Sequence, residues 1–208
     1  MLKSPGSDSL NGQDTRNARL YLTGLTASLL GDSAMTLIAG IWVKSLTGSN
    51  SAAALVSVGI YAPSLLAPVA GLVADRVRRR RLVLASNLAM AAVMLTLLGV
   101  DRASRVWLIY AVMTCYGAAL ALIDPAENAL FAIMLADDMR ARLNGLRMTL
   151  QEGCKLVAPL AGAGLFVAIG GGWVAALDAA TFGVAAVAVA MLRVHDPRPA
   201  PARAALAS

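Results

Sequence analysis

The fold is decided around residues 71–82, which read Gly-Leu-Val-Ala-Asp-Arg-Val-Arg-Arg-Arg-Arg-Leu. This short basic stretch separates two apolar blocks, at about 52–74 and 82–100. A helix needs about 20 apolar residues to cross the ~30 Å hydrocarbon core of a bilayer, and both blocks have about that length. The pattern therefore predicts two membrane-spanning segments joined by a basic loop.

The rest of the chain repeats this pattern. Further apolar blocks lie at about 20–42, 106–135, 143–169 and 173–192. In lipid, every backbone N–H and C=O must be hydrogen-bonded within the protein, so a span is either a helix or a barrel strand. Barrel strands alternate apolar and polar residues, and these blocks do not. We therefore predict an all-α, polytopic membrane bundle of about six transmembrane helices.

Composition agrees with this fold class. Of the 208 residues, 58% are hydrophobic and 14% are charged, and the mean hydropathy is +0.68. A soluble domain of this size rarely carries so few charges. We expect three parts: a disordered cytoplasmic tail at 1–19, the six-helix domain at 20–192, and a cytoplasmic linker or tail at 193–208.

The basic residues predict the orientation. One side of the predicted bundle collects most of the arginines, namely Arg16, Arg19, Arg76, Arg78, Arg79, Arg80, Arg81, Arg140, Arg142, Arg193, Arg198 and Arg203, whereas the other side has only Lys44, Arg102 and Arg105. Positive residues concentrate in cytoplasmic loops. We expect a multi-pass protein of a bacterial-type inner membrane, surrounded by the lipid bilayer, with both termini in the cytoplasm.

Other classes of protein are disfavoured. The formal net charge of +6 is explained by these loops, so we expect no nucleic-acid partner. The two cysteines, Cys115 and Cys154, lie in apolar blocks without metal or disulfide spacing, and we expect no metal and no cofactor. The chain has no Gly-Lys-Ser/Thr phosphate-binding loop and no paired catalytic motif, so we do not expect an enzyme.

The basic loop also has a sequence motif that resembles a known one. Gly71, three residues, Asp75-Arg76 and then Arg79-Arg80 resemble the signature loop of the major facilitator superfamily, although Arg78 stands where many members have glycine. This resemblance implies that Gly71, Asp75, Arg76 and Arg79 belong to a conformational latch. It further implies that acids at the end of the fourth helix, Asp137 and Asp138, pair with the arginines of the loop.

Further stretches are similar to the branch that contains macrolide-efflux proteins and the enterobactin exporter. They are Gly31-Asp32, residues 46–49, residues 124–130 and residues 142–145. Ala158-Pro159 with Gly162 is similar to the Gly-Pro-x-x-Gly element of drug antiporters, which implies helix packing at Pro159 and Gly162. The arginine common in the fourth helix of drug antiporters is replaced by Met113.

The resemblance implies half of a twelve-helix fold. In such transporters the substrate path lies between two six-helix halves that rock against each other. We expect secondary transport, with efflux of a small amphipathic molecule and an antiporter type of proton coupling. The partner would be a second six-helix half, or a second copy in a homodimer. The alternative is a non-transporting truncated fragment, or an assembly partner of a second half.

Ionisable residues at membrane depth are costly, so each is a candidate for function. Asp32, in the middle of the first block, is either a proton-titrating or cation-binding acid or a structural acid bonded to hydroxyls or paired with Lys155. Glu152 and Lys155 share a helix face, which favours an ion pair between them. The alternative is that Lys155 is held by Asp32 and released on protonation.

Two more acids, Asp124 and Glu127, lie near the end of the fourth block, three residues apart. They either line an inner vestibule that attracts a cationic substrate or lie at the membrane interface beside a kink at Pro125. Asp178, in the sixth block, is interpreted as structural. The candidate substrate and proton-coupling residues are therefore Asp32, Glu127, Glu152 and Lys155.

Overall fold

The computed structural model describes residues 5–74, 77–134 and 137–192, and every element in these ranges is helical. The predicted all-α class is confirmed. The longer elements are α1 (Pro5–Thr47), α2 (Asn50–Tyr61), α3 (Ala67–Ala74), α4 (Arg79–Leu95), α5 (Val106–Met134), α6 (Asp137–Ile169) and α7 (Gly171–Met191). Three short 3₁₀ turns lie between them, η1 (Ala62–Leu66), η2 (Thr96–Gly99) and η3 (Ala103–Arg105).

Among the described residues, five helical stretches are long and apolar enough to cross a membrane, at 15–47, 79–99, 103–133, 140–169 and 171–191. The predicted second span is interrupted. It is divided into α2, η1 and α3, with Pro63 inside the 3₁₀ turn and Pro68 at the start of α3. A proline lacks the N–H that an α-helix interior requires and its ring clashes with the preceding turn, which explains why this span changes helix type.

Two reversals of the chain are made by single glycines with positive φ. Gly48 (φ +69°) ends α1 and its N–H donates to Lys44 O at 2.8 Å. Gly170 (φ +81°) ends α6 and its N–H donates to Phe166 O at 2.9 Å. Glycine adopts this left-handed conformation without the Cβ penalty. Consequently α1 is followed almost at once by α2, and α6 by α7.

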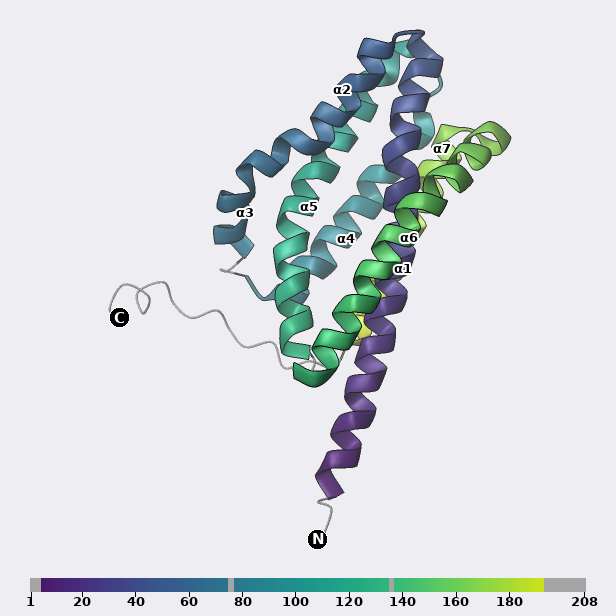
Figure 1. Cartoon of the computed structure of the whole chain (residues 1–208). Helices are drawn as coiled ribbons and strands as arrows, with labels where there is room; N and C mark the ends of the chain where they lie inside the picture. Colours follow the sequence, from purple (N-terminus) through teal and green to yellow (C-terminus); the bar gives the residue numbers. More distant parts are fainter. Residues whose placement is uncertain (1–4, 75–76, 135–136, 193–208) are drawn as a thin grey trace.

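The helices form two groups that diverge (Figure 1). The long helix α1 packs along α6 and α7, while α5 packs against α2, α3 and α4. The first part of α1 projects beyond the bundle. Contacts of α4 with α7, and of α1 with α2, connect the groups.

The main core fills the end where the groups meet. Its fully buried side chains come from α1, α2, α4, α5 and α7, and include Met35, Ile38, Met94, Ile109 and Met113. Arg102 and Arg105 lie at this end, whereas Arg79, Arg80 and Arg140 lie at the other, which we call the basic end. Away from the core the two groups separate, and this separation creates the site described below.

Small residues permit the closest helix contacts. A methyl group added at Gly117 of α5 would lie 2.0 Å from the backbone oxygen of Ile60 in α2. One added at Gly162 of α6 would lie 2.8 Å from Cβ of Ala34 in α1. Membrane helices associate through such close approach because lipid supplies no hydrophobic force between them.

Candidate functional site

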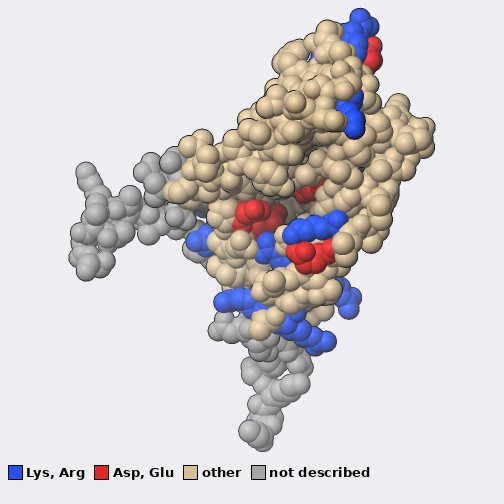
Figure 2. Space-filling view, turned by 45° about the horizontal axis from the view of Figure 1, so that its top comes forward, with Lys and Arg blue, Asp and Glu red and all other residues tan. Residues whose placement is uncertain are grey.

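A cavity of about 710 Å³ lies between the two helix groups. Its walls come from α1, α2, α5 and α6, with further residues from α4 and α7. Figure 2 shows acidic and basic side chains together in the hollowed middle of this face, apart from the arginines around the basic end. The volume falls within the ~300–1,000 Å³ typical of small-molecule sites.

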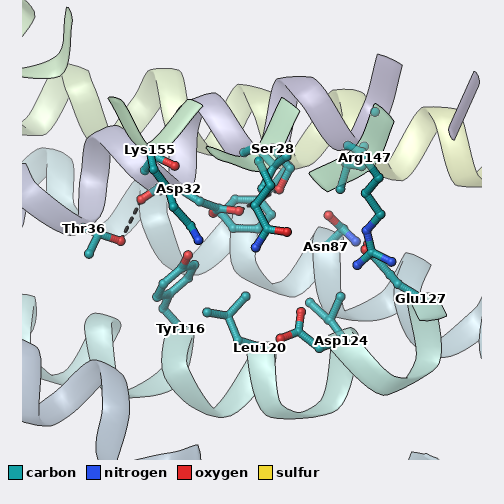
Figure 3. A pocket seen from close by; sticks show the side chains of 18 of the residues that line it. Ser28, Asp32, Thr36, Asn87, Tyr116, Leu120, Asp124, Glu127, Arg147 and Lys155 are labelled. Carbon is teal, nitrogen blue, oxygen red and sulfur yellow. Dashed lines mark hydrogen bonds between the residues drawn. The ribbon is translucent and has the colours of Figure 1, made fainter. Parts of the chain in front are cut away.

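Asp32 lies in the wall that α1 contributes. Its Oδ2 accepts a hydrogen bond of 2.9 Å from Ser28 Oγ, and its backbone oxygen accepts one of 2.7 Å from Thr36 Oγ1. Its Oδ1 is buried and has no hydrogen-bond partner within the described ranges. Figure 3 shows Tyr116 of α5 pointing across the cavity toward this carboxyl group. One carboxyl oxygen of Asp32, Oδ2, therefore has a hydrogen-bond donor, and the other, Oδ1, has none among the described residues.

Ser28, Asp32 and Thr36 are spaced four residues apart, so they form one polar stripe along α1. The side chains around them are mostly apolar or aromatic, including Leu29, Leu37, Leu120 and Phe182. A carboxyl group in such surroundings favours an ion pair with a bound cation, or a bound proton.

Lys155 and Glu152 form an ion pair on α6. Lys155 Nζ lies 2.7 Å from Glu152 Oε1, and the two side chains are 53% and 68% exposed. Lys155 also lines the cavity, and Glu152 does not. Within the described part of the chain, no hydrogen bond or ion pair joins Lys155 to Asp32. Of the two alternatives predicted for Lys155, the structure contains the pair with Glu152.

A second group of charges lies nearer the basic end. Asp124 and Glu127 line the cavity from α5, and Arg147 lines it from α6. Arg147 Nη1 donates to Asn128 Oδ1 at 2.5 Å. In Figure 3 its side chain extends toward the part of α5 that bears Glu127. The cavity thus contains three carboxyl groups and two basic groups, one of which is already paired with Glu152.

Several cavity residues were not among the predicted site residues, and Arg147 is the most important of them because it is charged. On α6 the lining residues are Arg147, Gln151, Lys155 and Pro159. Their spacing of four places them on one helix face. That spacing was present in the sequence and is the signal that would have found Arg147 and Gln151. Pro159, expected to serve helix packing, also lines this wall.

The predicted latch is only partly within the described ranges. Asp75 and Arg76 lie outside them, and so do the side chains of Asp137 and Asp138, the first residues of α6. Gly71 lies in α3, where an added methyl group would meet no described atom within 4 Å, and Arg79 begins α4. The pairing of these acids with Arg76 or Arg79 therefore stays a prediction.

Arg80, next to Arg79 at the start of α4, contacts the C-terminal end of α7. Arg80 donates from Nε to Val189 O at 3.1 Å and from Nη2 to Ala190 O at 2.6 Å. These carbonyls belong to the last turn of α7, which lacks the usual i+4 N–H donors, although the Leu192 N–H also donates to Val189 O at 3.3 Å. Arg80 therefore caps α7 and fixes the start of α4 to it.

No group of three or more potential metal-ligating His, Cys, Asp or Glu residues occurs among the residues described. The charged groups of the cavity are instead distributed along its length, from Asp32 to Glu127. This distribution suits the binding of an organic molecule with apolar and charged parts.

Comparison with known proteins gives a result that agrees with the helical membrane fold. The family model of the Major Facilitator Superfamily matches residues 20–208. Macrolide efflux protein A of Streptococcus pyogenes, and the protein of the same name from Streptococcus pyogenes serotype M6, are each 22% identical to this chain over 174 residues. The matched region is 82% of this chain and 43% of each relative. The chain thus spans about half the length of the curated relatives it matches.

Proposed function

The chain belongs to the Major Facilitator Superfamily, and we propose that it forms one six-helix half of an efflux transporter for small amphipathic molecules. The observation that carries this proposal is the cavity of about 710 Å³, with Asp32 held in a largely apolar wall. Aromatic side chains and leucines would contact the apolar part of the molecule, and the carboxyl groups would attract a positively charged part.

The charge balance of the cavity favours a cationic substrate. Asp32, Asp124 and Glu127 line it, and the opposing bases are Arg147 and Lys155. Since Lys155 is paired with Glu152, the cavity retains a net negative charge when all groups are ionised. The matched relatives are named for macrolide efflux, so a macrolide is the first substrate to test.

Transport would need a second half. The chain corresponds to 43% of each matched relative, and in the superfamily the path lies between two halves. We propose that a second six-helix half, or a second copy of this chain, covers the open side of the cavity. We further propose that both termini lie in the cytoplasm of a bacterial-type cell, with the basic end of the bundle on that side.

Asp32 is proposed as the residue that couples transport to cation movement. A carboxyl group that can exchange a bound proton for a cationic substrate provides antiport directly, because the two ligands compete for one charge. Glu127 and Lys155 would set the electrostatic environment of that exchange from the neighbouring walls.

The test is export by living cells. The chain is expressed in a bacterium lacking its main efflux pumps, and accumulation of a fluorescent lipophilic cation is measured for the wild type, Asp32→Asn and Asp101→Asn. We expect lower accumulation with the wild type and with Asp101→Asn, whose carboxyl group lies in the exposed loop between η2 and η3. We expect Asp32→Asn to restore accumulation.

The alternative is a chain that assembles with a second half and does not transport alone. It is favoured by the coverage of less than half of the relatives. Wild-type protein in the membrane without any reduction of accumulation, followed by export when a second six-helix half is co-expressed, would support this alternative.

A further inference from the structure

Asp178 of α7 is a buried acid outside the cavity lining. Its exposed fraction is 2%, although an isolated ionised carboxylate is among the costliest groups to bury. The Thr181 hydroxyl lies 2.7 Å from the backbone oxygen of Asp178 and 3.3 Å from its Oδ1. Because a hydroxyl has one hydrogen and the backbone contact is shorter, it satisfies Oδ1 weakly at best.

The other carboxyl oxygen of Asp178 has no hydrogen bond. Oδ2 is buried without a partner in the described part of the chain. Asp32 Oδ1 is in the same condition. Buried polar atoms without partners are rare in native proteins, and each requires an explanation such as a bound ion or proton.

The two acids come from adjoining positions of packed helices. A methyl group added at Gly31 would lie 2.2 Å from Asp178 Oδ1 and 2.4 Å from Thr181 Oγ1. Asp32 is the next residue of α1, so Asp32 and Asp178 lie at the same level along the packed helices, with the Asp32 side chain on the cavity side. Two ionised carboxylates close together in a poorly solvated site repel each other and cannot both stay charged without compensation.

The hydroxyl groups of Ser28 and Tyr116 face Asp32, but within the described ranges no basic side chain compensates the two charges. Tyr116 faces Asp32 from α5, with Asp124 and Glu127 farther along the same helix. On α6, Lys155 is paired with Glu152 and Arg147 donates to Asn128. On α4, Arg80 caps the end of α7. Within the described ranges, none of these bases forms an ion pair with Asp32 or Asp178.

We propose that Asp32 and Asp178 form one binding site for a monovalent cation at the contact of α1 with α7. Two carboxyl groups can hold such a cation either as a shared proton or as Na⁺ ligated by carboxylate and hydroxyl oxygens. One bound cation leaves the pair with a single negative charge in place of two. The proposal rests on the proposed function for its role in coupling, but the binding itself can be measured without transport.

The experiment uses the full chain purified into lipid nanodiscs, as wild type, Asp178→Asn, Asp32→Asn and Asp101→Asn. Infrared difference spectra are recorded from about pH 5 to about pH 9, a range above that in which exposed carboxyl groups titrate. Thermal unfolding is measured over the same range in choline chloride and in NaCl. Asp101→Asn is the matched control, since it also removes one carboxyl group.

Asp101 titrates outside this window. Arg102 donates to its carboxylate from Nε and Nη2, both at 3.2 Å, and together with Arg105 it holds the pKa of Asp101 below its usual value. Any stability that Asp101 contributes is therefore present above its unfolded pKa of ~3.9 and lost only as the pH falls below that value.

If the site holds a shared proton, the wild type has a protonated-carboxyl band that disappears as the pH rises, and its melting temperature falls over the same range. The sign follows because the folded state then binds a proton that the unfolded chain has released. Asp178→Asn and Asp32→Asn should each remove that band and flatten the melting curve, while Asp101→Asn retains both. If the site holds Na⁺, NaCl raises the melting temperature at high pH where choline chloride does not, and both site variants lose the difference.

The proposal is overturned if the wild type shows neither a titrating carboxyl band nor a Na⁺ response, or if Asp178→Asn retains whichever of the two the wild type shows. If Asp178→Asn does not fold, the wild-type spectra and Asp32→Asn decide alone. Cation binding without export, even when a second six-helix half is co-expressed, would contradict the proposed function and leave this site standing, so the two failures are distinguishable.

Discussion

Gly31 of α1 and Asp178 of α7 are in direct contact, and the contact leaves no room for a side chain at position 31. A methyl group there would lie 2.2 Å from Asp178 Oδ1. The glycine therefore allows an acid of one helix to be buried against the backbone of another, one residue away from Asp32. Asp32 on the cavity wall and the buried Asp178 behind it are therefore adjacent across the α1–α7 contact.

Substitution of Gly31 tests that contact. Gly31→Ala should force Asp178 and Thr181 to move and should destabilise the protein by about 1–3 kcal/mol, the usual cost of overpacking. Gly183→Ala on α7 is the control, because a methyl group there meets nothing within 4 Å and alanine is the better helix former. The measurement is thermal unfolding in nanodiscs, and equal melting temperatures for the two variants would contradict the contact.

A second glycine holds α5 against α2, on the other side of the cavity. A methyl group at Gly117 would lie 2.0 Å from Ile60 O and 2.8 Å from Ile60 C. Because these are backbone atoms, the helices themselves would have to separate. Gly117→Ala should cost about 1–3 kcal/mol, while Gly153→Ala on α6, with open space around it, should be nearly neutral. The measurement is denaturation in a series of detergent concentrations. Superimposable curves for Gly117→Ala and Gly153→Ala would contradict the contact of Gly117 with Ile60.

Arg80 is expected to protect the last turn of α7. Arg80→Gln removes the donors to Val189 O and Ala190 O and the positive charge at a helix C-terminus, together worth about 1 kcal/mol. Hydrogen exchange at residues 187–192 should accelerate about fivefold, since that energy corresponds to such a factor. Arg81→Gln, at an exposed position beside it, is the control. Unchanged exchange in Arg80→Gln would show that the cap contributes nothing.

The sequence was sufficient to predict the helical class and to select Asp32, which lines the cavity, because apolar blocks of membrane length and an acid in the middle of one are local properties. The sequence predicted residues 52–74 as one span, and the 3₁₀ turn at Pro63 became evident only in the structure. Which face of a helix meets the cavity depends on the neighbouring helices. For that reason Arg147, which lies just beyond the predicted basic loop at 140–142, was not identified from the sequence as a cavity residue.

Asp178 is a second residue whose surroundings could not be predicted from the sequence. In the sequence it is one acid in an alanine-rich helix, and a structural role was the reasonable interpretation. Its position opposite Gly31 depends on how α7 packs against α1, and its unpartnered Oδ2 depends on the burial that this packing produces. Neither property is encoded in the spacing of residues along a single helix.

The central claim is that the cavity lined by Asp32 binds an amphipathic cation, and ligand binding to the purified chain tests it most directly. Binding of a radiolabelled macrolide is measured in nanodiscs for the wild type, Asp32→Asn and Asp101→Asn. We expect one saturable site, weakened about tenfold by Asp32→Asn, or ~1.4 kcal/mol, and unchanged by Asp101→Asn. Failure of the wild type to bind, or equal affinity in wild type and Asp32→Asn, would contradict the account.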